Sequence, residues 1–481
     1  MRYGVLRAVT RGAAPVTTRC QQLKMSLAEN APPAGSQTLV VIVLLLLCVS
    51  ASAAPLEFSL HQIEGEQKGP VVLVIGGIQG DEPGGFNAAS LLATHYRLHN
   101  GAVWVVPNLN FESIVQRSRG VHGDMNRKFP AVPANDPDYA RVERIKTIIT
   151  DPKVSYVLNL HDGSGFYRPR HIDAKRSPKR WGQSIIIDQD AMSIAPYAPL
   201  AALARRVSSR VNKAVIKPLH QVHVKNTKTR DGNVEMAKTL TYFAINKGKP
   251  AVGIEASKSL PTHLRVYYHL HLIEAYLHEL GVRFERRFTL TPESVRRAVD
   301  DNINVAFYDR RLVLSLAGAR RSLRYVPMKK NAELNYEASS PLVAIRDSDD
   351  GFRVSYGNRR ITRLHPQFFD FDASLTHVSM TVDGAQRSVA VGSAVDVQER
   401  FLVDASAGLR VNVIGWRRPG IDSDAGVEIR RKALASRFSV DRDARLYRVE
   451  FYRGRRFAGM VLVRFVDSDR AALSSVTRPL S

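Results

Sequence analysis

Cysteine is almost absent from this chain. Its 481 residues include only Cys20 and Cys48, and both lie in a leader that we expect to be cleaved. The mature chain then has no thiol, so disulfide bridges and thiolate metal ligands are excluded. Cys48 follows Leu46 and Leu47 rather than the small residues that precede a lipoprotein cysteine, which argues against a lipid anchor.

Apolar runs long enough to cross a membrane are also missing. The run at 39–49 has 11 residues, whereas a membrane-spanning helix needs about 20. Basic residues precede it and Ala51-Ser52-Ala53 follows it, which is the pattern of a signal peptide. We therefore predict a signal peptide at 1–53 and export of the mature chain. An uncleaved anchor is the alternative, and Met25 is a second candidate for the start.

Acidic residues are few relative to basic ones. The chain has 69 Lys and Arg against 45 Asp and Glu, a formal net charge of +24 at pH 7. Such a charge attracts polyanions. The sequence has no nucleic-acid-binding motif, so we expect no nucleic-acid partner, and an exported protein meets anionic cell-wall polymer first. A solvated basic surface without a partner is the alternative.

Residues 71–280 alternate between short apolar runs and amphipathic runs. This alternation predicts an α/β domain in which a mixed or largely parallel sheet is flanked by helices. Strands are expected at 71–75, 103–106, 154–160, 184–187 and 251–255, and helices at 85–96, 138–150, 199–215 and 261–280.

Beyond Gly281 the pattern changes to many short strand-like runs. Asp383-Gly384 and Arg453-Gly454 are typical of hairpin turns, and the region is long enough for two small all-β domains. We predict four segments: the signal peptide at 1–53, an α/β domain at 54–285, a β-rich domain at 286–373 and a sandwich-like β domain at 374–481.

Polar side chains follow two of the expected strands. The strand at 71–75 leads into a glycine-rich loop with Gln79 and Glu82, and the strand at 154–160 leads into His161. Open α/β folds bind ligands at this edge of the sheet. Carboxylate and imidazole both suit Zn²⁺, which at a catalytic site keeps three protein ligands and an exchangeable water. A purely structural histidine is the alternative.

Other catalytic signatures are missing. The glycine-rich loop lacks a Gly-Lys-Ser/Thr ending and carries acidic residues, which argues against a phosphate site. Ser164 lacks the glycine spacing of a nucleophile elbow. Four histidines at 261–280 lack the His-Glu-x-x-His pattern, and we expect them at the surface or at an interface: His263, His269, His271 and His278.

Three motifs together resemble the zinc metallo-carboxypeptidase clan. Gln79-Gly80-Asp81-Glu82 occupies the place of the clan's paired metal ligands, and His161 that of its distant histidine. Arg119 and the run at 123–129 resemble its substrate-binding segment. The run at 253–257 resembles the strand that carries its general base.

This resemblance implies a role for each matched residue. The implied ligands of one Zn²⁺ per chain are Gln79, Glu82 and His161. The implied catalytic residues are Glu255, as general base and then acid, and Arg119, as the group that stabilises the oxyanion. The residues implied to bind the terminal carboxylate of the substrate are Asn126 and Arg127.

Gln79 departs from most of the clan, where histidine is usual. Glutamine at this place, with two β-rich domains behind the peptidase domain, resembles the bacterial periplasmic D,L-carboxypeptidases that trim peptidoglycan and help to set cell shape. That branch implies removal of the terminal residue, meso-diaminopimelate, from a tripeptide stem to leave a dipeptide. The stem peptide is then the expected partner, and the β domains are candidates for contacts with the cell wall or with envelope proteins.

Two alternatives remain open. An N-acyl amino-acid amidohydrolase of the desuccinylase and aspartoacylase type shares the metal scheme, although the export signal and the β-rich region argue against it. A non-catalytic wall-binding scaffold is the second, and it would follow if glutamine at position 79 had abolished metal binding.

Overall fold

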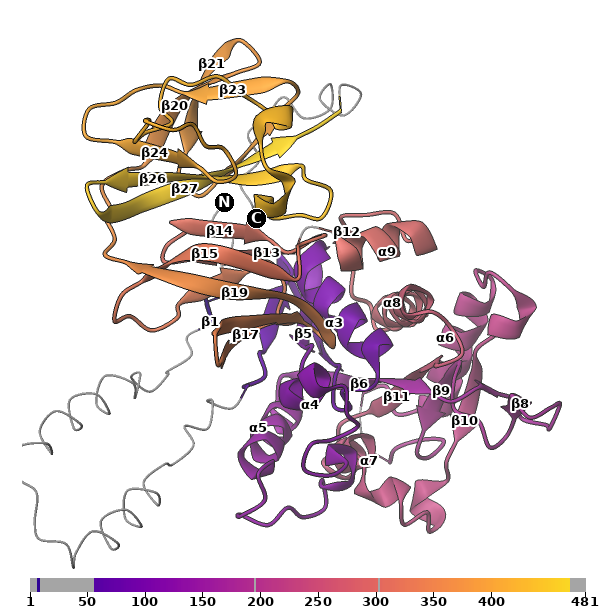
Figure 1. Cartoon of the computed structure of the whole chain (residues 1–481). Helices are drawn as coiled ribbons and strands as arrows, with labels where there is room; N and C mark the ends of the chain where they lie inside the picture. The colour runs from indigo at the N-terminus through magenta and orange to yellow at the C-terminus, as the bar shows by residue number, and fades with distance from the viewer. Residues whose placement is uncertain (1–6, 9–55, 194–195, 302, 468–481) are drawn as a thin grey trace, which may run out of the picture.

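The computed structural model describes residues 7–8, 56–193, 196–301 and 303–467. An α/β part is followed along the chain by two β-rich parts (Figure 1). The predicted signal peptide lies outside the described residues except for β1 (Arg7–Ala8), which pairs with β16 (Tyr336–Ala338). No helix in the described ranges has both the length and the apolar composition to cross a bilayer.

A seven-stranded mixed sheet organises the α/β part. Its strands, from one edge to the other, are β10 (His223–Asn226), β9 (Ser184–Ile187), β11 (Ala251–Ser257), β6 (Val154–Gly163), β3 (Gln67–Ile75), β5 (Asn100–Val106) and β2 (His61–Glu64). The four strands from β11 to β5 are parallel, whereas β9 and β2 run antiparallel to the neighbours β11 and β5. The predicted mixed sheet is confirmed.

Helices cover both faces of this sheet (Figure 1). One face carries α3 (Pro83–His95), α6 (Leu200–Asn212) and α8 (Thr262–Glu279), and α8 contacts both of the others. The other face carries α5 (Tyr139–Thr150) and α7 (Leu240–Asn246), with α4 (Phe111–Gln116) beside them. In α8 the apolar residues recur at helical spacing and are buried, which explains its place against the sheet: Val266, Leu270, Ile273 and Leu277.

One helix beyond Gly281, α9 (Pro292–Asp300), was not among the expected elements. Thr291 caps it by accepting a hydrogen bond from Ser294 N, and Pro292 stands in the first turn, where its fixed φ suits a helix. Only Val295 and Val299 are buried. Two apolar residues one turn apart make too short a stripe to predict a helix from periodicity.

The first β-rich part packs directly against the α/β part. One of its sheets contains β15 (Ser322–Lys329), β19 (Arg359–Phe369), β18 (Gly351–Tyr356) and β17 (Val343–Ser348), and the other contains β1, β16, β13 (Asn304–Phe307) and β14 (Leu312–Ser315). Its buried side chains, among them Phe307 and Val326, belong to the same continuous core as those of the α/β part.

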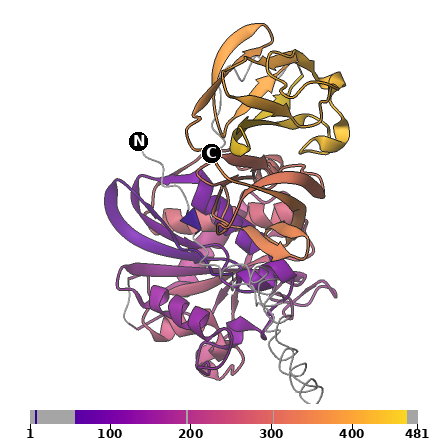
Figure 2. The ribbon, with the colours of Figure 1, turned by 60° about the vertical axis from the view of Figure 1, so that its left-hand side comes forward.

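Most buried apolar residues of the last β-rich part form a second core, whereas a few, among them Tyr452 and Met460, belong to the first one. One sheet contains β21 (Ala385–Ala390), β20 (His377–Val382), β23 (Arg400–Val403) and β25 (Ile429–Arg430), and the other contains β22 (Ala394–Val397), β27 (Arg456–Phe465), β26 (Leu446–Arg453) and β24 (Arg410–Val413). The expected turn at Asp383-Gly384 joins β20 to β21, and both residues have positive φ, +51° and +87°. In both views this part lies against the preceding one and away from the α/β sheet (Figure 2).

Because of this second core, we predict that the last β-rich part can unfold independently of the rest of the chain. Phe451 is fully buried there, so Phe451→Ala should destabilise this part by about 3 to 5 kcal/mol. Differential scanning calorimetry should show one transition moved to lower temperature while the main transition stays in place. Phe368→Ala, at a side chain that is 53% exposed, is the control. A single transition that moves as a whole would contradict the separation.

Candidate metal centre and active site

The carboxyl ends of β3, β6 and β11 bring the chemically active side chains to one edge of the sheet. Gln79 and Glu82 lie in the loop between β3 and α3. His161 and Glu255 are directly paired residues on the neighbouring strands β6 and β11. The loop packs closely on α4, because a Cβ at Gly80 would lie 2.1 Å from the carbonyl oxygen of Ser113.

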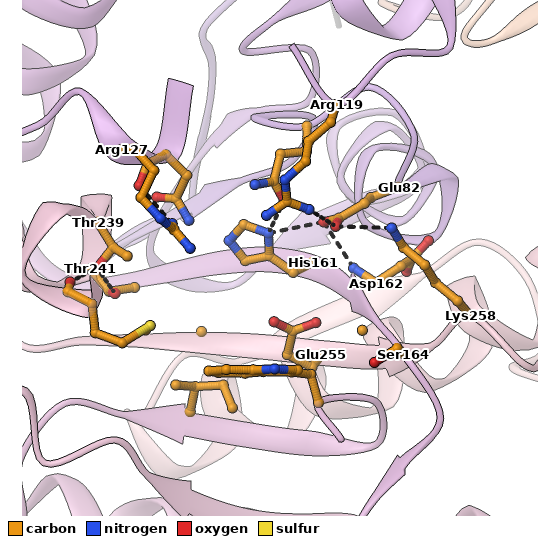
Figure 3. Close-up of a pocket in the computed structure, with 17 residues that line it drawn as sticks. Glu82, Arg119, Arg127, His161, Asp162, Ser164, Thr239, Thr241, Glu255 and Lys258 are labelled. Carbon is orange, nitrogen blue, oxygen red and sulfur yellow. Dashed lines mark hydrogen bonds and ion pairs between the residues drawn. The ribbon is translucent and has the colours of Figure 1, made fainter. Parts of the chain in front are cut away.

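Three atoms with lone pairs converge at this edge (Figure 3). His161 Nδ1 lies 3.2 Å from Gln79 Oε1 and 2.9 Å from Glu82 Oε2. All three residues are buried, with exposed fractions of 2% for Gln79, 4% for Glu82 and 7% for His161. The structure therefore brings together the three residues expected from the sequence to bind a metal ion.

The donor set fits a divalent cation. An amide oxygen, a carboxylate oxygen and an imidazole nitrogen are all ligands that such ions accept, and their lone pairs are held close together out of water. Among the described residues no three His, Cys, Asp or Glu side chains gather into a metal site, and at this edge one of the three donors is an amide.

Asn159 supports the same interpretation. Its Nδ2 lies 2.8 Å from His161 Nε2, and its buried Oδ1 has no hydrogen-bond partner among the described residues. A half-turn of this amide would let Oδ1 accept a hydrogen bond from the N–H at His161 Nε2. The tautomer with the proton on Nε2 leaves the Nδ1 lone pair free for a metal ion.

Glu255 lies beside the converging ligands, and one of its carboxyl oxygens, the buried Oε2, makes no hydrogen bond to the described residues. Burial, together with the charges of Glu82 and Asp162, raises the pKa of Glu255 to about 8, although His161 and Lys258 act in the opposite direction. A carboxyl group with a raised pKa can both take up and release a proton near neutral pH.

Two cations and one further carboxylate surround Glu82 and Gln79. Arg119 Nη1 and Lys258 Nζ lie 3.6 Å and 3.4 Å from Glu82 Oε1. Asp124 accepts a hydrogen bond from Gln79 Nε2 at 2.8 Å and another from Arg119 Nε at 3.0 Å. Burial alone would raise the pKa of Asp124, but the hydrogen bond from Gln79 and the charges of Arg119 and Arg127 hold it below its ordinary value.

All seven candidate residues line one pocket with a volume of about 320 Å³. Asn126 and Arg127 belong to the short 3₁₀ helix η1 (Met125–Arg127) and line this pocket. Arg127 lies across the pocket from Glu255 (Figure 3). Arg127 Nη1 donates to the carbonyl oxygen of Asn126 at 3.0 Å. Its side chain is 32% exposed, so the guanidinium is accessible from the pocket. The sequence-based assignment of roles to these seven residues stays a prediction.

Several residues of the site were missed in the sequence. Asp162 is buried and accepts hydrogen bonds from Gly84 N, Arg265 and His269. The expectation that His269 lies at the surface or an interface was wrong, because His269 is fully buried and its Nε2 contacts Asp162 Oδ1 at 3.2 Å. The position of Asp162 directly after His161 was the one signal that could have pointed to it.

The comparisons with known proteins agree with this geometry. A family model described as the catalytic domain of carboxypeptidases controlling helical cell shape matches residues 38–300, and a model of the C-terminal domain of metallo-carboxypeptidase matches residues 371–466. A search of the curated proteins gave no match.

Solved structures of one relative cover most of the chain. The apo structure of the cell shape determinant protein Csd4 from Helicobacter pylori has a TM-score of 0.76 at 39% identity, covering 85% of this chain and 100% of that one. A tripeptide-bound structure of the same protein gives the same values. The form bound to mDAP, described as a D,L-carboxypeptidase, is 41% identical and covers 83% of this chain and 97% of that one, with a TM-score of 0.75.

These matches confirm the resemblance inferred from the motifs. They extend from the α/β part through the last β-rich part. The chain belongs to the family of metallo-carboxypeptidases that control helical cell shape.

Proposed function

We propose that this chain is a zinc-dependent D,L-carboxypeptidase that removes the terminal residue, meso-diaminopimelate, from peptidoglycan tripeptide stems and leaves a dipeptide. The observation that carries the proposal is the convergence of Gln79 Oε1, Glu82 Oε2 and His161 Nδ1 beside Glu255. The relative bound to a tripeptide, and to mDAP, supports the choice of substrate.

The residues present would hold one Zn²⁺ through the amide, the carboxylate and the imidazole. When bound, the ion polarises the scissile carbonyl and lowers the pKa of a water molecule. Glu255 would accept a proton from the attacking water as the new C–O bond forms, and it would then pass that proton to the leaving amine as the C–N bond breaks. The carboxyl group of Glu255 is available for this transfer because it lines the same pocket as the three ligands.

The cations of the pocket act on the substrate's negative charges. Arg119, whose Nε is held by Asp124, donates hydrogen bonds to the oxyanion that forms at the scissile carbonyl. Arg127 and Asn126 bind the terminal carboxylate, because a guanidinium can bond both of its oxygens. A stem peptide that ends in diaminopimelate carries several carboxylates, and the pocket's Arg119, Arg127 and Lys258 match that charge.

The place of action that we propose is the periplasm. The support is the sequence pattern of 1–53, in which basic residues, an apolar run of 11 residues and small residues follow one another. The net charge of +24 suits an environment of anionic wall polymer. We propose the β-rich parts as the surfaces for contacts with the wall or with envelope proteins.

Replacing the general base tests the mechanism. Glu255→Gln keeps the shape of the side chain but removes its ability to take a proton, so kcat should fall by about 10² to 10⁴ while zinc content stays unchanged. Digestion of purified tripeptide muropeptides, followed by mass spectrometry, measures turnover, and elemental analysis measures zinc. Glu143→Gln, on the far helix α5, is the control. Normal turnover by Glu255→Gln would refute the assignment, and loss of zinc would make Glu255 a ligand instead.

Removing the proposed carboxylate-binding group tests substrate recognition. Arg127→Ala loses a charged hydrogen bond worth about 1.5 to 3 kcal/mol, so kcat/KM should fall about 10- to 150-fold, chiefly through KM. With the unmodified enzyme, amidation of the terminal carboxylate of the tripeptide should lower kcat/KM by the same factor. With Arg127→Ala, amidation should lower kcat/KM only slightly further. If amidation weakens both enzymes equally, Arg127 does not bind that carboxylate.

Acylated amino acids, assayed in parallel with the tripeptide, test the alternative that the chain is an amidohydrolase.

A further inference from the structure

A glutamine ligand raises a problem of orientation. The two ends of its amide are similar in size, but only the carbonyl oxygen has lone pairs for a metal ion, whereas the NH₂ group only donates hydrogen bonds. A half-turn about the last side-chain bond exchanges the two ends, and that torsion has little intrinsic preference. Some other group in the fold must therefore decide which end of Gln79 faces His161.

Asp124 contacts the nitrogen end of this amide. Gln79 Nε2 donates to Asp124 Oδ1 at 2.8 Å, and the same oxygen accepts from the backbone N–H of Asn126 at 3.0 Å. The other oxygen, Oδ2, accepts from Arg119 Nε. An ionised carboxylate offers acceptors only, so Gln79 must present its NH₂ group to Asp124. Gln79 Oε1 then faces His161 Nδ1 at 3.2 Å.

We propose that Asp124 is a positioning residue that selects the carbonyl end of Gln79 for the metal ion. The inference rests on the metal site of the proposed function. With the amide reversed, Gln79 Oε1 and Asp124 Oδ1 would meet with no proton between them, and the NH₂ group would occupy the ligand position. Both consequences oppose the reversed orientation, so a neutral amide serves as a defined ligand.

The contact partners of Asp124 show which effects the test must separate. Through Oδ2 it holds Arg119, which we place at the oxyanion, and through Oδ1 it caps the 3₁₀ helix that carries Asn126 and Arg127. Loss of activity in an Asp124 variant would therefore have several causes. Zinc affinity measured without substrate reports on Gln79 and not on the groups that bind substrate.

The experiment measures zinc affinity of the purified full chain by competition with a chromophoric chelator. Asp124→Leu removes every acceptor. Asp124→Asn removes the charge but keeps one carbonyl oxygen, which the backbone N–H of Asn126 holds at the Oδ1 position, where Gln79 Nε2 can still donate. Each variant is made with Gln79 and with Gln79→Glu, whose two equivalent oxygens need no selection. Thermal unfolding checks that each variant folds, and Asp124→Ala replaces the leucine variant if that one does not.

With Gln79 in place, Asp124→Leu should weaken zinc binding about 10- to 100-fold. Asp124→Asn should weaken it by no more than about threefold, which corresponds to about 0.7 kcal/mol. With Gln79→Glu, whose two oxygens are equivalent, Asp124→Leu removes only the charge of Asp124, so the loss of zinc affinity should shrink to that of Asp124→Asn.

Three results would overturn the proposal. Equal losses in Asp124→Leu and Asp124→Asn would show an effect of charge alone. If Asp124→Leu lowers zinc affinity equally with Gln79 and with Gln79→Glu, Asp124 has a general structural role. If Asp124→Leu leaves zinc affinity unchanged, Asp124 does not set the orientation of Gln79. The metal site is tested separately by Gln79→Ala, because undiminished zinc binding in that variant would remove Gln79 as a ligand and the proposed site with it.

Discussion

Two side-chain oxygens held 2.9 and 3.2 Å from one imidazole nitrogen in a buried place are the constraint on which the rest of this structure depends. Gln79 Oε1, Glu82 Oε2 and His161 Nδ1 could not share that space in water-free surroundings without a proton or a cation between them. The fold supplies the rigidity that keeps them there. Two of them come from a loop that is fixed between a buried strand and a helix, and the third comes from the neighbouring strand.

Positively charged side chains surround the carboxylate ligand of this site. Glu82 is the carboxylate of the three, and Arg119 and Lys258 approach its outer oxygen while His161 contacts the inner one. Burial alone would lower the pKa of His161, but the hydrogen bond to Glu82 and its charge raise it above the ordinary value. A divalent cation would replace that proton. With such a cation bound, the positive charges at the pocket would outnumber its carboxylates, which favours a substrate rich in carboxylates.

The sequence predicted the parts of this site that follow simple patterns. The strands that lead to Gln79, His161 and Glu255 are continuous apolar runs, so the strands themselves and the sheet edge that they share could be predicted. The role of Gln79 required the resemblance to a known family, because amides rarely bind metal ions. Residues that act through contacts distant in sequence could not be foreseen, since nothing in the periodicity of α8 places His269 against Asp162. The helix α9 was missed because its apolar stripe is too short.

A crystal structure of the zinc-loaded chain, with anomalous scattering recorded at the zinc edge, tests the proposed metal site most directly. We expect a single strong peak at the edge of the sheet, about 2.0 to 2.2 Å from Gln79 Oε1, Glu82 Oε2 and His161 Nδ1, with Glu255 outside the coordination sphere. A peak bound to other side chains, or one with the NH₂ group of Gln79 turned toward it, would contradict the account.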